Sequence, residues 1–438
     1  MPPTRYFRRI PLSFSRAIIA LVLLACLVPG QDPVLRAGVA AVDITPSTLE
    51  PMYGYGNRRC GPAATGTHDR LHAKVLYLEA GADRMAIVTM DLGSMESKTL
   101  FARVADELKI PLLLLSPSHT HSAPQFLGRP GGDESPSSYR AELEEKIYTA
   151  VKRAAGSTFP ARLSVGRGAM QLGYNRLLLR EDGRARAVFD NLERIPYGPV
   201  DPEFLLLQVS DLEGRPKALA IHYAVHPVVL GPTSCLYSAD YPGVTQARVE
   251  AAMPGVQTMF VQGAAGSTNP LFQGRTGDNE KDFATMTKMG ELLADAVIQS
   301  AKQLRPIEDR PASIAHRTQV LSFQNRWETG KTLTLGLSTI LINEQIAIAT
   351  VPGEPFLAMQ SRWKQEANAP YVFFYGYTQN TPDPWPGYIP DMRSAALGGY
   401  GADVGTAIEV GAAERIMDQH LKQLYDLKGM WRNEPGKP

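Results

Sequence analysis

The stretch Ile110-Pro-Leu-Leu-Leu-Leu-Ser-Pro-Ser-His-Thr-His-Ser-Ala-Pro124 carries the signal that decides the fold. Its apolar part, residues 110–115, predicts a buried strand, and His119 and His121 follow shortly after it. Polar residues that follow a strand lie at the rim of a sheet, where α/β proteins build their sites. The segment therefore predicts an α/β fold with a metal or catalytic site at the carboxyl ends of its strands.

Three further strand ends carry polar groups: His226, the loop 266–270, and Glu354 after the apolar run 346–351. Four of the 8 histidines in the 438 residues lie in just two of these places, at positions 119, 121, 222 and 226. Two histidines and a carboxylate from separate strand ends are the ligand set of a catalytic zinc site. We therefore predict that His119, His226 and Glu354 bind one zinc ion.

Each of these elements has a second interpretation when it is taken alone. The His-x-His pair is also typical of a solvated loop. His222 and His226 would share one side of a strand, and we assign His222 to the core. Glu354 precedes a predicted helix at 355–367, where a carboxylate is stabilised by the helix dipole. These interpretations stay open at the level of sequence.

The remaining pattern alternates strands with helices. We expect strands at 71–78, 85–90, 204–209, 218–224 and 257–261, and helices at 97–108, 139–155, 281–304 and 407–427. Residues 333–350 predict a hairpin that turns at 343–345. No linker is long or polar enough to mark a break. The expected architecture is a mixed β-sheet flanked by helices, in one domain over residues 31–438.

Composition and the N-terminus indicate an exported protein that does not bind nucleic acid. The net charge is +1, which implies no basic face for nucleic acid. Residues 1–30 join an arginine-rich start to a short apolar run, which is typical of a signal peptide. Export to the periplasm or medium is expected, with a lipoprotein site at Cys26 as the alternative. Cys60 and Cys235 remain in the mature chain, either as one disulfide or as two free thiols.

Several motifs together resemble the catalytic domain of the neutral/alkaline non-lysosomal ceramidase family. The match includes Ser118-His-Thr-His-Ser-Ala-Pro124, close to the family pattern Thr-His-Thr-His-Ser-Gly-Pro, followed in order by Tyr223-Ala-Val-His-Pro227 and Val351-Pro-Gly-Glu354. The segments Ala37–Pro46, Met52–Gly56, Ala64–Leu71 and Ala86–Gly93 look like the start of that domain. The resemblance covers residues 37–425, and these motifs are specific as a set.

The resemblance implies a single zinc ion held by two histidines, a glutamate and a tyrosine. The matching positions are His119, His226, Glu354 and Tyr388, and Tyr400 matches a second tyrosine of the site. His121 and Arg176 match residues that line the site and bind the polar head of the substrate. From the residues alone, Arg176 could equally be a surface charge, because Arg180, Arg184 and Arg186 follow it closely.

Two features depart from the family. The family's serine loop reads Gly-Asp-Val-Ser-Pro-Asn, whereas this chain reads Gly266-Ser-Thr-Asn-Pro270, so Asn269 occupies the serine position and Ser267 replaces the aspartate. An asparagine cannot act as the nucleophile, and we expect Asn269 to position other groups. The sequence also ends shortly after residue 430, and we therefore expect no counterpart of the C-terminal immunoglobulin-like domain that the resemblance implies.

The predicted chemistry is hydrolysis of an amide by zinc-activated water. Zinc lowers the pKa of bound water to about 7 and polarises a carbonyl, which removes the need for a serine. His121 would transfer a proton to the leaving amine, while Tyr400 and Arg176 would stabilise the oxyanion.

The expected substrate is an N-acyl sphingosine or a related N-acyl lipid, with a pocket mouth lined by Trp385, Tyr388 and Ile389 and peripheral contact with a membrane. Two alternatives are a zinc hydrolase of a non-lipid substrate and a non-catalytic exported binding protein.

Overall fold

A computed structural model describes residues 33–125, 138–308 and 311–431 of the chain. The predicted signal peptide and Cys26 lie outside these residues. From Val34 onward the chain forms one compact unit. Within the described part, no helix combines the length and apolar character needed to cross a bilayer.

The larger sheet has nine strands, and it gathers the strand ends that carry His119 and His226. Its order is β13-β11-β10-β6-β1-β3-β4-β5, with β15 beside β6. The pairs β4–β5 and β11–β13 are parallel, and the others are antiparallel. The strands are β1 (Leu35–Asp43), β3 (His72–Ala80), β4 (Asp83–Met90), β5 (Leu112–Pro117), β6 (Phe159–Ala169), β10 (Glu203–Asp211), β11 (Pro216–Tyr223), β13 (Gln257–Gln262) and β15 (Arg305–Pro306).

A second sheet of four strands carries the approach to Glu354. Its order is β16-β17-β18-β20, with bounds β16 (Ile314–Gln324), β17 (Thr332–Ile342), β18 (Ile346–Thr350) and β20 (Tyr371–Tyr375). The predicted hairpin is confirmed as β17 and β18. Asn343 and Glu344 form its turn with φ values of 50° and 57°, in the left-handed region that such tight turns use. Thr350 ends the strand four residues before Glu354.

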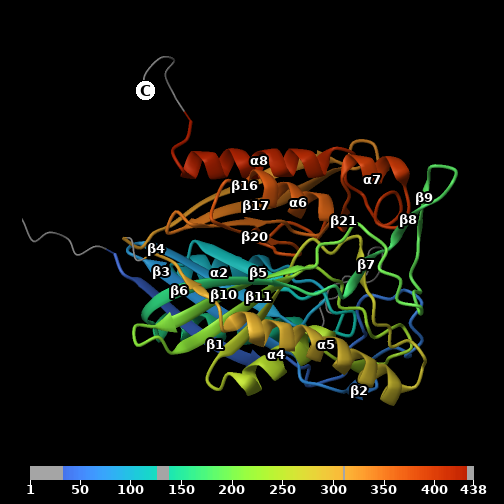
Figure 1. Ribbon diagram of the computed structural model, residues 1–438, viewed down its shortest axis with the longest axis horizontal. Helices are drawn as coiled ribbons and strands as arrows, with labels where there is room; N and C mark the ends of the chain where they lie inside the picture. Colours follow the sequence, from blue (N-terminus) through green and yellow to red (C-terminus); the bar gives the residue numbers. More distant parts are fainter. Residues whose placement is uncertain (1–32, 126–137, 309–310, 432–438) are drawn as a thin grey trace, which may run out of the picture. The chain divides into compact units, whose positions relative to one another are not determined.

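The two sheets pack face to face between layers of helices (Figure 1). Leu78 and Leu205 of the larger sheet share one buried cluster with Ile340 and Ile348 of the smaller sheet. Helices α2, α3, α4 and α5 cover the outer face of the larger sheet, whereas α6 and α8 cover that of the smaller sheet. The bounds are α2 (Lys98–Leu108), α3 (Ser138–Gly156), α4 (Asp240–Ala252), α5 (Asn279–Ala301), α6 (Leu357–Glu366), α7 (Met392–Leu397) and α8 (Ala412–Leu427).

The expected mixed α/β fold with flanking helices is confirmed, but the strands divide into two sheets instead of one. Short pairs complete the framework: β2 (Gly66–Thr67) with β12 (Leu236–Tyr237), β7 (Gly173–Asn175) with β14 (Thr268–Pro270), β8 (Leu177–Leu179) with β9 (Ala185–Ala187), and β19 (Glu354–Pro355) with β21 (Tyr388–Ile389).

Two helix starts were predicted too early. The closing helix begins at Ala412, directly after Gly411, whose φ of 89° is outside the helical region. The helix expected from residue 355 begins at Leu357. Glu354 is extended instead, and its N–H donates to the carbonyl of Gly387 across the β19–β21 pair.

Candidate metal-dependent active site

Two loops and the short strand β19 bring His119, His226 and Glu354 to one point in the interior. His119 lies two residues beyond β5, and His226 lies three residues beyond β11. The relative exposures of His119, His226 and Glu354 are 1%, 1% and 6%, respectively. His119 adopts a φ of 70°, a conformation that costs a non-glycine residue about 1–3 kcal/mol and is concentrated at functional sites. The three side chains predicted as ligands therefore do converge.

Backbone carbonyls fix the orientation of both histidine rings. The Nδ1 atoms of His119 and His226 each lie 2.6 Å from a carbonyl oxygen, that of Gly93 and that of Ala265. Because a carbonyl only accepts hydrogen bonds, each Nδ1 carries the proton and each Nε2 presents a lone pair. Metal-binding histidines are held in this way in general.

Glu354 completes the set with one carboxylate oxygen. Its Oε2 lies 3.0 Å from Nε2 of His226 and 3.3 Å from Nε2 of His119. Ligands about 2.0–2.2 Å from a tetrahedral zinc ion are separated by about 3.4 Å, so these distances fit such an ion. Burial alone would raise the pKa of Glu354, but the two imidazoles, when they are protonated, outweigh it and hold the pKa well below its usual range.

His121 lies at the edge of the same cluster. One ring nitrogen from each of His119, His121 and His226 falls within 4.8 Å of the other two, so a buried group of three histidines could also hold a metal ion. Nδ1 of His121 has no hydrogen-bond partner among the described residues. Burial, with the neighbouring imidazoles, lowers the pKa of His121 well below its usual range.

Tyr388 and Tyr400 lie beside this centre with Arg176. Strand pairing places Tyr388 directly next to Glu354, and its ring centroid lies 6.5 Å from that of His226. The Arg176 guanidinium lies 5.0 Å from the Tyr388 ring centroid and 5.2 Å from that of Tyr400. Arg176 is only 3% exposed, which excludes the interpretation as a surface charge.

The loop with Asn269 supports its neighbours. Oδ1 of Asn269 lies 3.4 Å from Nη1 of Arg176, and Nη2 of the same guanidinium donates to the carbonyl of Gly266 at 2.7 Å. The carbonyl of Thr268 accepts the backbone N–H of His226. Asn269 is 2% exposed. The geometry is that of a residue that holds Arg176.

Residues that were not predicted also build the site. The amide of Gln262, at the end of β13, donates to the carbonyls of Ser118 and Val225 at 3.1 and 3.0 Å, and so links the loops of both histidines. The Tyr377 hydroxyl lies 3.5 Å from Nε2 of His226. Tyr377 follows β20, so its position after an apolar run was the available signal. No local pattern marks Gln262.

The three residues expected at the mouth of the pocket lie in different surroundings. Ile389 is fully buried and Tyr388 is 6% exposed, because their side chains point to opposite faces of β21 and each packs in a buried cluster. Trp385 stacks on His119, with centroids 6.0 Å apart and planes 15° apart. A cavity of about 510 Å³ opens beside the centre, and Tyr388 lines it together with groups that include Tyr55, Arg176, Phe189, Arg275 and Tyr400.

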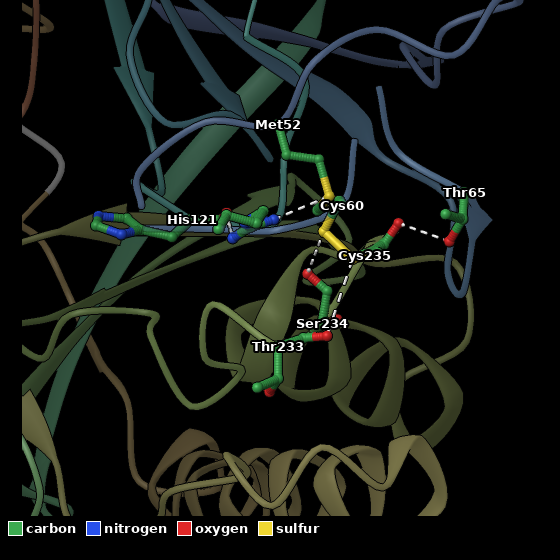
Figure 2. The surroundings of a disulfide bond; sticks show 8 residues. Met52, Cys60, Thr65, His121, Thr233, Ser234 and Cys235 are labelled. Carbon is green, nitrogen blue, oxygen red and sulfur yellow. Dashed lines mark hydrogen bonds between the residues drawn. A yellow bond between two sulfur atoms is a disulfide. The ribbon is translucent and has the colours of Figure 1, made fainter. Parts of the chain in front are cut away.

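The fold decides the role of His222 and the pairing of the two cysteines. His222 donates from Nε2 to the carbonyl of Phe374 at 2.7 Å and belongs to the core, as predicted. Cys60 and Cys235 form a disulfide (Figure 2). Between Cys60 and the site, Arg58 donates to the carbonyl of His121 at 2.6 Å. The disulfide thus anchors a segment that contacts the centre.

Comparisons with known proteins agree with this fold. Residues 35–290 match the family described as neutral/alkaline non-lysosomal ceramidase, N-terminal. The chain is 24% identical over 288 residues to neutral ceramidase B of Dictyostelium discoideum, an alignment that covers 59% of this chain and 39% of that protein. It therefore spans less than half the length of this relative.

Solved structures share the fold. The crystal structure of neutral ceramidase from Pseudomonas aeruginosa matches with a TM-score of 0.71 and 17% identity, covering 93% of this chain and 76% of that one. A ceramidase described as complexed with C2 matches with a TM-score of 0.71 and 16% identity, covering 93% and 77%.

Proposed function

Because the chain belongs to the neutral/alkaline non-lysosomal ceramidase family, we propose that it is a zinc-dependent hydrolase that cleaves an amide bond. The observation that supports this most directly is the convergence of His119, His226 and Glu354. Both imidazoles present Nε2 to one carboxylate oxygen, while their Nδ1 atoms are held by carbonyls. We take these three residues as ligands, with Tyr388 as the fourth.

The chain's own residues would then serve the reaction. A bound zinc ion would activate water and polarise the substrate carbonyl. The water oxygen would add to the carbonyl carbon, the C–N bond would break, and one of the water's protons would pass to the leaving amine while the acyl group leaves as the carboxylic acid. We assign this proton to His121, because its Nδ1 has no partner in the described structure and its Nε2 lies 3.2 Å from that of His119. Arg176 and Tyr400 would stabilise the developing oxyanion.

The proposed substrate is an N-acyl sphingosine or a related N-acyl lipid taken from a membrane surface. Family membership supports it, and one protein of similar fold is described as a ceramidase complexed with C2. A non-lipid amide is the second candidate. It is favoured by Asn269 in the serine position and by the two guanidinium groups that line the cavity.

We also propose that the protein is exported. Residues 1–30 have the pattern of a signal peptide, and a disulfide between Cys60 and Cys235 would persist in an oxidising compartment.

The test is an assay of the purified mature protein against N-acyl sphingosines and simple N-acyl amines. We expect amide cleavage that is lost with a chelator and restored by zinc. Cleavage of small polar amides alone would refute the lipid substrate and leave the hydrolase. A zinc content near zero, without turnover, would instead support a binding protein.

A further inference from the structure

The cavity beside the metal centre contains a second guanidinium group that the proposed chemistry does not use. Arg275 lines this cavity together with Arg176. Phe189 connects the two: its ring lies 5.9 Å from the Arg176 guanidinium, while its carbonyl accepts from Nη1 of Arg275 at 3.0 Å. Two positive groups therefore flank one wall of the same cavity.

Arg275 is held firmly in place. Nη2 donates to the carbonyl of Val228 at 3.1 Å, and the side chain is only 15% exposed. Its stem passes over Gly231, where a Cβ atom would come within 2.6 Å of Cγ of Arg275. A guanidinium with a fixed stem loses little conformational freedom on binding, which suits the recognition of a ligand.

Little negative charge balances these two arginines. The residues that line the cavity include two guanidinium groups and one carboxylate, that of Asp190. Asp190 lies 3.5 Å from Arg275, but its side chain is 81% exposed, and such an exposed pair is weak. The Nε atoms of Arg176 and Arg275 have no hydrogen-bond partner among the described residues. Two further acids near the cavity have other partners: Glu354 is directed at His119 and His226, and Asp240 accepts the backbone N–H groups of Leu230 and Tyr241.

We infer that Arg275 forms, with Arg176, a subsite for an anionic group on the substrate, such as a carboxylate, phosphate or sulfate. The inference rests on the proposed amide hydrolysis and specifies its substrate class. All three anions accept hydrogen bonds from a guanidinium fork, so the chemistry is shared. Arg275 would select the substrate by its polar end, and Asp190 would compete with the substrate's anion for the same fork.

The experiment compares matched substrates that differ in one charge. The pairs are an N-acylglycine against its glycinamide, and a phosphorylated against an unphosphorylated N-acylsphingosine. We expect the wild type to prefer the anionic member. Arg275→Gln should lower kcat/KM for it by about tenfold to a hundredfold, as expected for a lost hydrogen bond to a charged group, and should lower that for the neutral member much less.

Two further variants make the test specific. Asp190→Asn, at an exposed position, should increase the preference, because it removes the competing carboxylate. Arg248→Gln, whose arginine pairs with Asp295, is the matched control and should leave the preference unchanged. The two substrate pairs distinguish the kinds of anion. Selectivity only between the N-acylglycine and its glycinamide assigns the subsite to a carboxylate. Selectivity only between the phosphorylated and unphosphorylated N-acylsphingosine assigns it to a phosphate.

Calorimetric binding separates this inference from the proposed function. If the zinc-loaded protein binds the N-acylglycine more tightly than its amide but hydrolyses neither, the subsite stands and the amidase proposal falls. If both members are hydrolysed equally, or Arg275→Gln affects both members alike, the anion subsite is refuted and the hydrolase stands.

Discussion

Nε2 of His121 lies 3.2 Å from Nε2 of His119, yet the two rings are supported differently. His119 has its Nδ1 fixed by the carbonyl of Gly93, whereas Nδ1 of His121 has no partner among the described residues. A ligand needs a fixed ring with a lone pair directed at the metal, and a proton carrier needs an available second nitrogen. His119 therefore suits the role of a metal ligand, and His121 suits that of the acid–base group.

This difference predicts how metal content responds to substitution. His119→Ala and Glu354→Ala should each remove most of the bound zinc, because each deletes a ligand from a buried site. His121→Ala should keep the zinc and lose most of the activity, since proton transfer contributes about a hundredfold or more. Metal analysis by mass spectrometry, with His222→Ala as a core-histidine control, measures the difference.

Two outcomes would contradict the assignment. Full zinc occupancy in both His119→Ala and Glu354→Ala would exclude these residues as ligands. Loss of zinc in His121→Ala would instead show that the cluster of three histidines is the metal site.

Asn269 provides the second prediction. It accepts from Arg176 and cannot act as a nucleophile, so Asn269→Ala should weaken activity without abolishing it. A loss of about tenfold is expected for one hydrogen bond to a charged group. Steady-state kinetics measures the loss, and Asn269→Asp, which keeps the acceptor, should retain more activity. A covalent acyl-enzyme trapped on Ser267 or Thr268 would show that the mechanism is different.

Gln262 provides the third prediction, because its single amide links the two histidine loops. Gln262→Leu preserves the approximate volume but leaves the carbonyls of Ser118 and Val225 without this donor. Groups that support metal ligands contribute about tenfold to a hundredfold in metal affinity. Zinc titration against a competing chelator should show a loss of this size. An unchanged affinity would mean that the loops hold their positions without Gln262.

The sequence predicted those parts of the site that depend on local pattern. His119, His226 and Glu354 each follow an apolar run, and strand periodicity identifies such runs directly. The turn at Asn343 and Glu344 was predicted for the same reason, because it separates two apolar segments. In each case the signal lies within a few neighbouring residues.

The remaining features depend on contacts between distant residues. Gln262 acts on two loops far away in the sequence, and no local pattern marks such pairing. Strand β16 was missed because its alternation is weak, with exposed residues at 317–320. Division of the strands into two sheets depends on which strands pair, and runs of similar apolar strands do not specify their partners.

The disulfide provides the fourth prediction. Cys60 and Cys235 are separated by 175 residues, and in the chain-entropy model closing a long loop stabilises a protein by about 2–5 kcal/mol. The double variant Cys60→Ser, Cys235→Ser should lose this amount in urea unfolding and also lose activity, since Arg58 contacts His121. Reductant should destabilise the wild type equally and leave the double variant unchanged. Equal stabilities of both proteins would contradict a formed disulfide.

The last prediction concerns stability in acid and uses a histidine far from the metal centre. Burial lowers the pKa of His420 from 6.5 to about 3, and its Nδ1 lies 2.8 Å from the Thr339 hydroxyl. The unfolded chain therefore binds a proton below pH 6.5 that the folded protein excludes. The stabilisation by His420 is present above pH 6.5 and is lost as the pH falls towards about 3, at about 1.4 kcal/mol per pH unit.

His420→Leu removes this proton uptake, so its free energy of unfolding should fall less steeply with acidification than that of the wild type. Urea unfolding between about pH 6 and pH 4.5 avoids most carboxylate titration. Thr339→Val is the matched control: it deletes the hydrogen bond but keeps the imidazole, so it should lower stability while preserving the slope. Identical slopes in the wild type and His420→Leu would mean that the imidazole is already charged in the folded protein, against the effect of its burial.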